Sequence, residues 1–180
     1  MEIHLSHRVI NVVDYDPNWI QVFDVEKILL ANAIGNNAVK IEHIGSTAVK
    51  GLPAKPVIDI LIEVTSLIGL DALNMNIEAL NYLVKGENGI SGRRYFQKGG
   101  YQRTHHIHAF QTGDLNLIRH RAFKEYLIAH PVVASKYGKI KRDAILKCGN
   151  NMNVYMALKN EFILRHEKLA LVWFGNLQGV

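Results

Sequence analysis

Residues 57–64 constrain the fold more than any other stretch of this chain. Their sequence, Val-Ile-Asp-Ile-Leu-Ile-Glu-Val, is rich in β-branched residues and almost wholly apolar, which is typical of a central strand buried on both faces. Asp59 interrupts the run, and an isolated carboxylate is costly to bury unless a cation, a metal ion or hydrogen-bond donors compensate it. Asp59 is therefore either half of a structural ion pair, with Lys55 or an arginine, or part of a functional site.

The rest of the chain predicts a mixed β-sheet packed with helices, an α+β domain. Further expected elements are strands at residues 39–44, 93–97 and 101–110 and helices at residues 17–34 and 73–84. From Gly113 onward the pattern is helical, with breaks at Pro131 and Gly149, so the C-terminal third should be helical. No repeat, low-complexity stretch or Pro/Ser-rich linker marks a boundary, and residues 1–180 are expected to form one domain.

Charge is the informative part of the composition. The chain has 21 Lys and Arg against 16 Asp and Glu, a formal charge of +5, which favours acidic partners such as nucleotides or phosphorylated metabolites. Basic stretches near the C-terminus carry apolar residues at helical spacing, so we interpret them as solvated helix faces and do not expect nucleic-acid binding. The single Cys148 fits a reducing, cytoplasmic compartment. Residues 1–10 lack the apolar run of a signal peptide, and no run of about 18 apolar residues predicts a membrane span.

Gly45 and Ser46 form a candidate anion-binding turn. They follow a predicted strand and precede Thr47, where a helix with unpaired amide groups could begin. A phosphate would fit such a turn, since glycine allows close backbone approach, Ser46 adds a hydroxyl donor and Lys50 and Lys55 add charge. The alternative is an ordinary strand-to-helix turn capped by Ser46.

Histidines form a second cluster. Because side chains alternate along a strand, His106 and His108 should share one face of the strand at residues 101–110, with Arg103 and His105 on the other. Two imidazoles at this spacing could ligate a metal ion, relay protons or contact phosphate. With nine histidines in the chain, ordinary surface or core histidines are the alternative.

The Gly45-Ser46 pair, followed about a dozen residues later by Asp59 in an apolar strand, is similar to the nucleotidyltransferase signature. Several segments resemble the GrpB family in the right order: residues 13–19 (Val-Asp-Tyr-Asp-Pro-Asn-Trp), 43–59, 106–110 (His-Ile-His-Ala-Phe), 123–131 and 155–162. Lys50 stands where most members have proline. The resemblance covers nearly the whole chain and implies a nucleotidyltransferase-like fold.

The resemblance implies less about activity than about the fold. Active nucleotidyltransferases hold metal ions with two carboxylates two residues apart. Asp59 matches the first, but Leu61 stands at the second position, and Glu63 lies roughly 13 Å from Asp59 at strand rise. The resemblance therefore implies either a metal-dependent nucleotidyl or phosphoryl transferase with an altered ligand set, or a non-catalytic binding module with a degenerate active site.

Together these patterns predict one composite site. Its catalytic residues, which would also ligate Mg²⁺, Mn²⁺ or Zn²⁺, are Asp59, His106 and His108. The residues expected to contact a nucleotide or phosphorylated small molecule are Gly45, Ser46, Lys55 and Arg103. This prediction requires the strand of Asp59 and the strand of the two histidines to be neighbours, with all three side chains entering one cleft beside Ser46.

Overall fold

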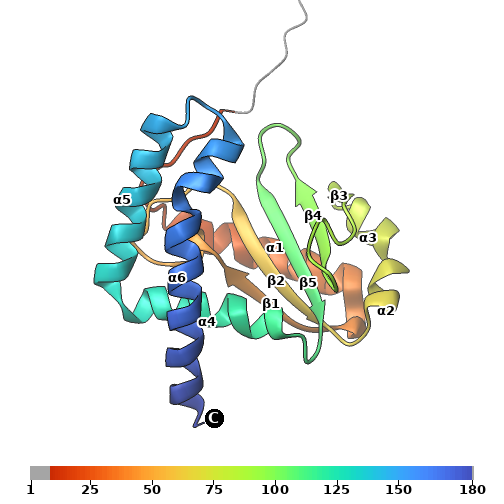
Figure 1. The fold of residues 1–180 in the computed structure, drawn as a ribbon. Coiled ribbons are helices and arrows are strands. Elements are labelled where there is room, and N and C mark those ends of the chain that lie inside the picture. The colour runs from red at the N-terminus through yellow and green to blue at the C-terminus, as the bar shows by residue number, and fades with distance from the viewer. Residues whose placement is uncertain (1–8, 180) are drawn as a thin grey trace, which may run out of the picture.

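A computed structural model describes residues 9–179 and contains one five-stranded sheet with helices on both faces (Figure 1). Its strands are β1 (Ala38–Ile44), β2 (Ile58–Val64), β3 (Tyr82–Val84), β4 (Arg94–Lys98) and β5 (His105–Gln111). Its helices are α1 (Asn18–Ile34), α2 (Leu67–Asp71), α3 (Asn74–Glu78), α4 (Leu115–Ala129), α5 (Pro131–Lys147) and α6 (Met152–Gln178), with 3₁₀ turns η1 (Gly35–Asn37) and η2 (Ser46–Ala48). The expected α+β class, with a mixed sheet and a helical C-terminal third, is confirmed.

Strand β2 has the central, doubly buried position that its sequence predicts. The sheet order is β1-β2-β5-β4-β3, and β2 runs antiparallel to β1 and parallel to β5. Ile60 packs in the cluster that contains Leu30 of α1, whereas Leu61 packs on the other face with Phe110 and Leu117 of α4. Both faces of β2 are covered because nearly every side chain along it is apolar.

Two expected elements are wrong in type or extent. The predicted helix at residues 73–84 ends early, since Asn81 has a positive φ of 67° and the chain then forms β3. Antiparallel pairing of β3 with β4 overrides the local helical periodicity. The strand expected at residues 101–110 begins only at His105, because the turn that starts at Gly99, with φ 97°, extends through Thr104.

The C-terminal helices begin where the sequence predicts. Asp114 caps α4 by accepting a hydrogen bond from the Asn116 amide at 2.8 Å, and Pro131 occupies the first turn of α5. The three helices lie together over one face of the sheet (Figure 1). No helix in residues 9–179 is both long enough and apolar enough to span a membrane.

Candidate functional site

A cavity of about 500 Å³, here called the inner cavity, lies between the sheet and the C-terminal helices. Strands β2 and β5 contribute Asp59, His106 and His108, while α5 and α6 contribute Lys141 and Lys159. In the parallel register Asp59 pairs with His106, so the two strands are neighbours as predicted. All three predicted side chains enter this one cavity, which confirms their placement and leaves their roles as predictions.

Hydrogen bonds from imidazoles hold Asp59. His106 Nδ1 lies 3.2 Å and His108 Nε2 lies 3.6 Å from the same oxygen, Asp59 Oδ1. Arg93 Nη1 lies 3.4 Å from His108 Nδ1, and an arginine only donates, so this nitrogen of His108 accepts and Nε2 carries the proton toward Asp59. Burial alone would raise the pKa of Asp59, but hydrogen bonds from His106 and then His108 outweigh it and hold this pKa well below its usual range.

Gly45 brings the neighbouring turn against Asp59. Its φ is +71°, and a Cβ atom at this position would lie 2.6 Å from Asp59 Oδ2, so only glycine fits without displacing the carboxylate. Ser46 begins η2, which is a three-residue 3₁₀ turn. The expected α-helix beginning near Thr47 is therefore wrong, and the role of Gly45 and Ser46 in binding phosphate stays a prediction. Ser46 accepts a hydrogen bond from Lys141 Nζ at 2.9 Å.

Lys141 is the least exposed cation of the inner cavity. Only 2% of its surface is exposed, and no carboxylate within the described chain forms a salt bridge with it. Burial first, and then the charges of Lys159 and Lys55, lower the pKa of Lys141 to about 7, against an opposing effect of Asp59. Burial also lowers the pKa of Lys159.

Positive charge dominates the lining. The four basic side chains are Lys55, Arg93, Lys141 and Lys159, and the carboxylates are Asp59 and Glu167. Glu167 is neutralised in part by Arg119, whose Nη1 lies 3.4 Å from its carboxylate. The cavity thus has an excess of cations over anions, which suits an anionic ligand.

Sequence reasoning missed three of these cations, Arg93, Lys141 and Lys159. We interpreted the basic C-terminal stretches as solvated faces, yet Lys141 points inward. One signal was present: Tyr137, Lys141 and Ala144 follow the i, i+4, i+7 spacing of one helix face, and all three are buried.

Other residues considered from the sequence lie outside the inner cavity. Arg103, which we expected to contact the phosphorylated ligand, is not among the residues that line the inner cavity. Leu61, at the position of a second carboxylate, is 0% exposed in the apolar core. Glu63 accepts a hydrogen bond at 2.7 Å from Arg121, which belongs to α4. Strand β2 therefore offers no second carboxylate beside Asp59.

The predicted divalent-metal site stays a prediction. Within residues 9–179, no three His, Cys, Asp or Glu side chains are grouped so as to hold a metal ion. Asp59 Oδ1 is contacted directly by both imidazoles, and both ring nitrogens of His108 already face a partner. An ion at Asp59, His106 and His108 would have to replace some of these contacts.

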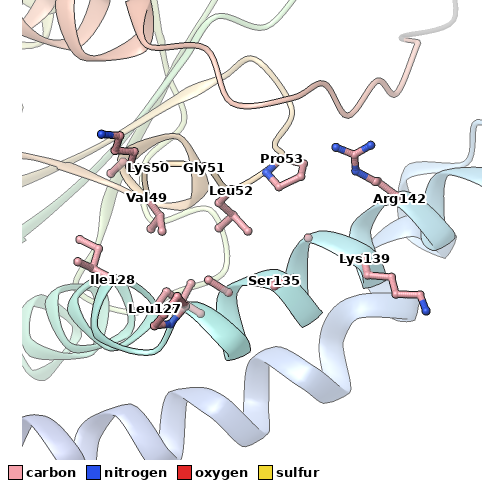
Figure 2. Close-up of a pocket in the computed structure, with 14 residues that line it drawn as sticks. Val49, Lys50, Gly51, Leu52, Pro53, Leu127, Ile128, Ser135, Lys139 and Arg142 are labelled. Carbon is pink, nitrogen blue, oxygen red and sulfur yellow. The ribbon is translucent and has the colours of Figure 1, made fainter.

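A larger cavity of about 660 Å³, here called the outer cavity, lies between the segment at residues 48–53 and helices α4 and α5 (Figure 2). Its walls are mostly apolar, and Figure 2 shows Lys50 at one end and Lys139 and Arg142 at the other. Arg142 forms an ion pair with Asp14. No histidine or carboxylate lines it, so we place the candidate site in the smaller, inner cavity, where titratable side chains converge.

Comparison with known proteins gives consistent matches over most of the chain. A family model described as GrpB protein matches residues 9–169. The crystal structure of the conserved protein GrpB from Enterococcus faecalis is 39% identical, with a TM-score of 0.88 over 91% of this chain and 99% of that one. The UPF0157 protein YqkA of Bacillus subtilis (strain 168) is 40% identical over 166 residues, which cover 92% of this chain and 48% of YqkA. The chain thus spans about half the length of that relative.

A more distant likeness joins the chain to a crystal structure of the Cid1 poly(U) polymerase. The identity is 12% and the TM-score 0.43, over 73% of this chain and 45% of the other. At this distance the likeness bears on no residue of the site.

Proposed function

This chain belongs to the GrpB family, as its motifs indicated, and on that premise we propose that its inner cavity binds a phosphorylated small molecule or nucleotide. The observation that carries the proposal is the excess of cations, Lys55, Arg93, Lys141 and Lys159, among the side chains that line the inner cavity. A buried positive charge is costly unless a counter-charge compensates it, and within residues 9–179 neither Lys141 nor Lys159 forms a salt bridge with a carboxylate. An anionic ligand would supply the missing charge.

The size and walls of the cavity support a small ligand. A volume of about 500 Å³ falls within the range of roughly 300 to 1,000 Å³ usual for small-molecule sites. Besides the cations, the lining includes the aromatic rings of Tyr95, Phe123, Tyr137 and Tyr155. Such a lining suits a ligand with a phosphate at one end and an apolar or planar group at the other.

Binding without metal-dependent transfer is the function that these residues support best. The second carboxylate position holds buried Leu61, so the usual two-metal arrangement has no ligand there. A metal-dependent nucleotidyl or phosphoryl transfer is the alternative. The convergence of Asp59 with His106 and His108 favours it, since a carboxylate and two imidazoles suit Zn²⁺ or Mn²⁺ better than Mg²⁺.

Thermal denaturation with inorganic phosphate, pyrophosphate and ATP, at constant ionic strength, tests the proposal. Each ligand that binds the folded protein should raise its melting temperature in a concentration-dependent way. Lys159→Met should reduce that shift, because it removes a cation of the inner cavity. Lys139→Met is the matched control, since Lys139 lines only the outer cavity on the same helix as Lys141. The proposal is wrong if no phosphate compound stabilises the protein, or if both variants reduce the shift equally.

A further inference from the structure

We infer that Ser46 is a nucleophile and Lys141 its general base, acting on a carboxylic ester or thioester that carries an anionic group. The assignment of an anionic substrate rests on the proposed function of the inner cavity; the assignment of the two residues rests on their own geometry. Lys141 Nζ lies 2.9 Å from Ser46 Oγ, within the distance at which a proton passes between them.

Ser46 and Lys141 differ in burial, and this difference suits them to different roles. Ser46 is half-buried and lines the inner cavity, so its hydroxyl can meet a ligand. Lys141 is buried on α5, and its ammonium also lies 4.5 Å from the centre of the Tyr137 ring. A nucleophile facing the cavity with an amine base adjacent to it is the arrangement of serine–lysine hydrolases and acyltransferases.

The surroundings of Lys141 favour the neutral amine that a base requires. Lys159 faces it from α6 and Lys55 from the segment between η2 and β2, and both disfavour a further positive charge. Asp59 on β2 has the opposite effect, but burial outweighs it and the pKa of Lys141 falls to about 7. A substantial fraction of the amine is therefore unprotonated near neutral pH, whereas an exposed lysine is almost wholly protonated.

The proposed reaction uses these groups in sequence. Ser46 Oγ bonds to the carbonyl carbon of the substrate while its proton passes to the neutral Lys141 amine. The bond from carbon to the leaving oxygen or sulfur then breaks, and the Lys141 ammonium returns the proton to that leaving group. Water next attacks the acyl-Ser46 ester, with Lys141 again accepting and returning the proton, to release a carboxylic acid and free Ser46. The other cavity cations would hold the anionic group of the substrate.

Phenylmethylsulfonyl fluoride tests the nucleophile, because it forms a sulfonyl ester with activated serine hydroxyls. A sulfur–oxygen bond forms at Ser46, and fluoride leaves while Lys141 takes the serine proton. Intact-mass and peptide measurements should find one modification per chain, located at Ser46. The labelling rate should rise with pH through about 7, following deprotonation of Lys141.

Variants of Lys141 separate a base from a merely structural neighbour. Lys141→Met should slow labelling by roughly 100-fold, since general-base catalysis contributes typically about 10²- to 10⁴-fold. Lys141→Arg should slow it as well, because arginine keeps the charge but stays protonated. Lys141→Met should remain folded, as replacing a buried charge with an apolar side chain is often neutral or stabilising. Circular dichroism checks the fold, and Lys139→Met should label at the wild-type rate.

The inference is overturned if the wild-type protein is not labelled, if the label lies elsewhere than Ser46, or if both Lys141 variants label at the wild-type rate. The reagent carries no anion, so its reaction does not depend on the anion site. If phosphate stabilises the protein but Ser46 stays unlabelled, the nucleophile is wrong and the proposed binding function stands. If Ser46 is labelled but phosphate neither stabilises the protein nor slows labelling, the anionic substrate class is wrong.

Discussion

Asp59 belongs both to the central strand of the sheet and to the candidate site. It belongs to a doubly buried strand, yet its side chain is 30% exposed to the inner cavity. Its nearest partners, His106 and His108, come from β5. The parallel register that pairs Asp59 with His106 therefore fixes the carboxylate beside both imidazoles.

Asp59→Asn should lower the free energy of unfolding at pH 7 by roughly 1 to 3 kcal/mol, because hydrogen bonds to a charged group are lost. The folded-state pKa of Asp59 lies below its ordinary value of 3.8. The carboxylate thus contributes stability above about pH 4, and this contribution is lost as the pH falls through and below that value. The difference between wild type and variant should accordingly shrink with falling pH. Urea unfolding at several pH values measures it.

A different result for Asp59→Asn would support the metal-binding alternative. If Asp59→Asn leaves the metal-free protein as stable as wild type at pH 7 but removes a stabilising effect of Zn²⁺ or Mn²⁺, then Asp59 acts mainly as a ligand. Glu78→Gln gives a matched control, since Glu78 lies at the end of α3, outside the lining of the inner cavity.

At the scale of elements, the contact between α5 and the segment that carries Ser46 sets the geometry of the proposed nucleophile. Gly138 lies three residues before Lys141 on α5, and a Cβ atom there would lie 2.9 Å from Pro53 Cδ. The absence of a side chain at Gly138 lets the segment approach the helix closely. This approach places Ser46 within reach of Lys141 although 95 residues separate them in the sequence.

Gly138→Ala should displace the segment that carries Ser46. Alanine favours the helix by about 1 kcal/mol, while overpacking against Pro53 costs typically about 1 to 3 kcal/mol, so we expect a net loss of stability of up to about 2 kcal/mol. Labelling of Ser46 by phenylmethylsulfonyl fluoride should slow at the same time. Lys139→Ala, on the exposed side of the same helix, should change neither quantity. Wild-type labelling in Gly138→Ala would show that this contact does not position Ser46.

The elements that the sequence predicts well are those whose signals are local. The apolar run of β2, the stop of α1 at Gly35 and the first turn of α5 at Pro131 depend on neighbouring residues alone. Strand β3 was missed because its conformation depends on pairing with β4. In the same way Asp59 was found as a charge within an apolar strand and the histidines from strand alternation, whereas Lys141 and Lys159 reach the site only through packing of the helical layer on the sheet.

On the scale of the whole molecule, the inner cavity lies between two layers, the sheet and the C-terminal helices. The sheet supplies Asp59, His106 and His108, and helices α5 and α6 supply Lys141 and Lys159. Figure 1 shows the sheet and the layer of α4, α5 and α6 as neighbours. Helix α6 packs against both α4 and α5, so Lys159 is held by the same packing that holds Lys141. A ligand in this cavity would contact both layers at once.

Hydrogen exchange monitored by mass spectrometry should therefore show that pyrophosphate protects both layers together. The expected segments are those around Ser46 and β5 on the sheet side, and α5 with the first half of α6 on the helical side. A ligand that binds only the folded protein makes local opening of these segments rarer. Helix α3, which packs against α1 and β3 away from the cavity, should exchange at its unliganded rate. Lys159→Met should weaken protection in both layers. Protection confined to the outer faces of the helices would instead indicate a superficial anion site, since a ligand in the inner cavity must reach the strands.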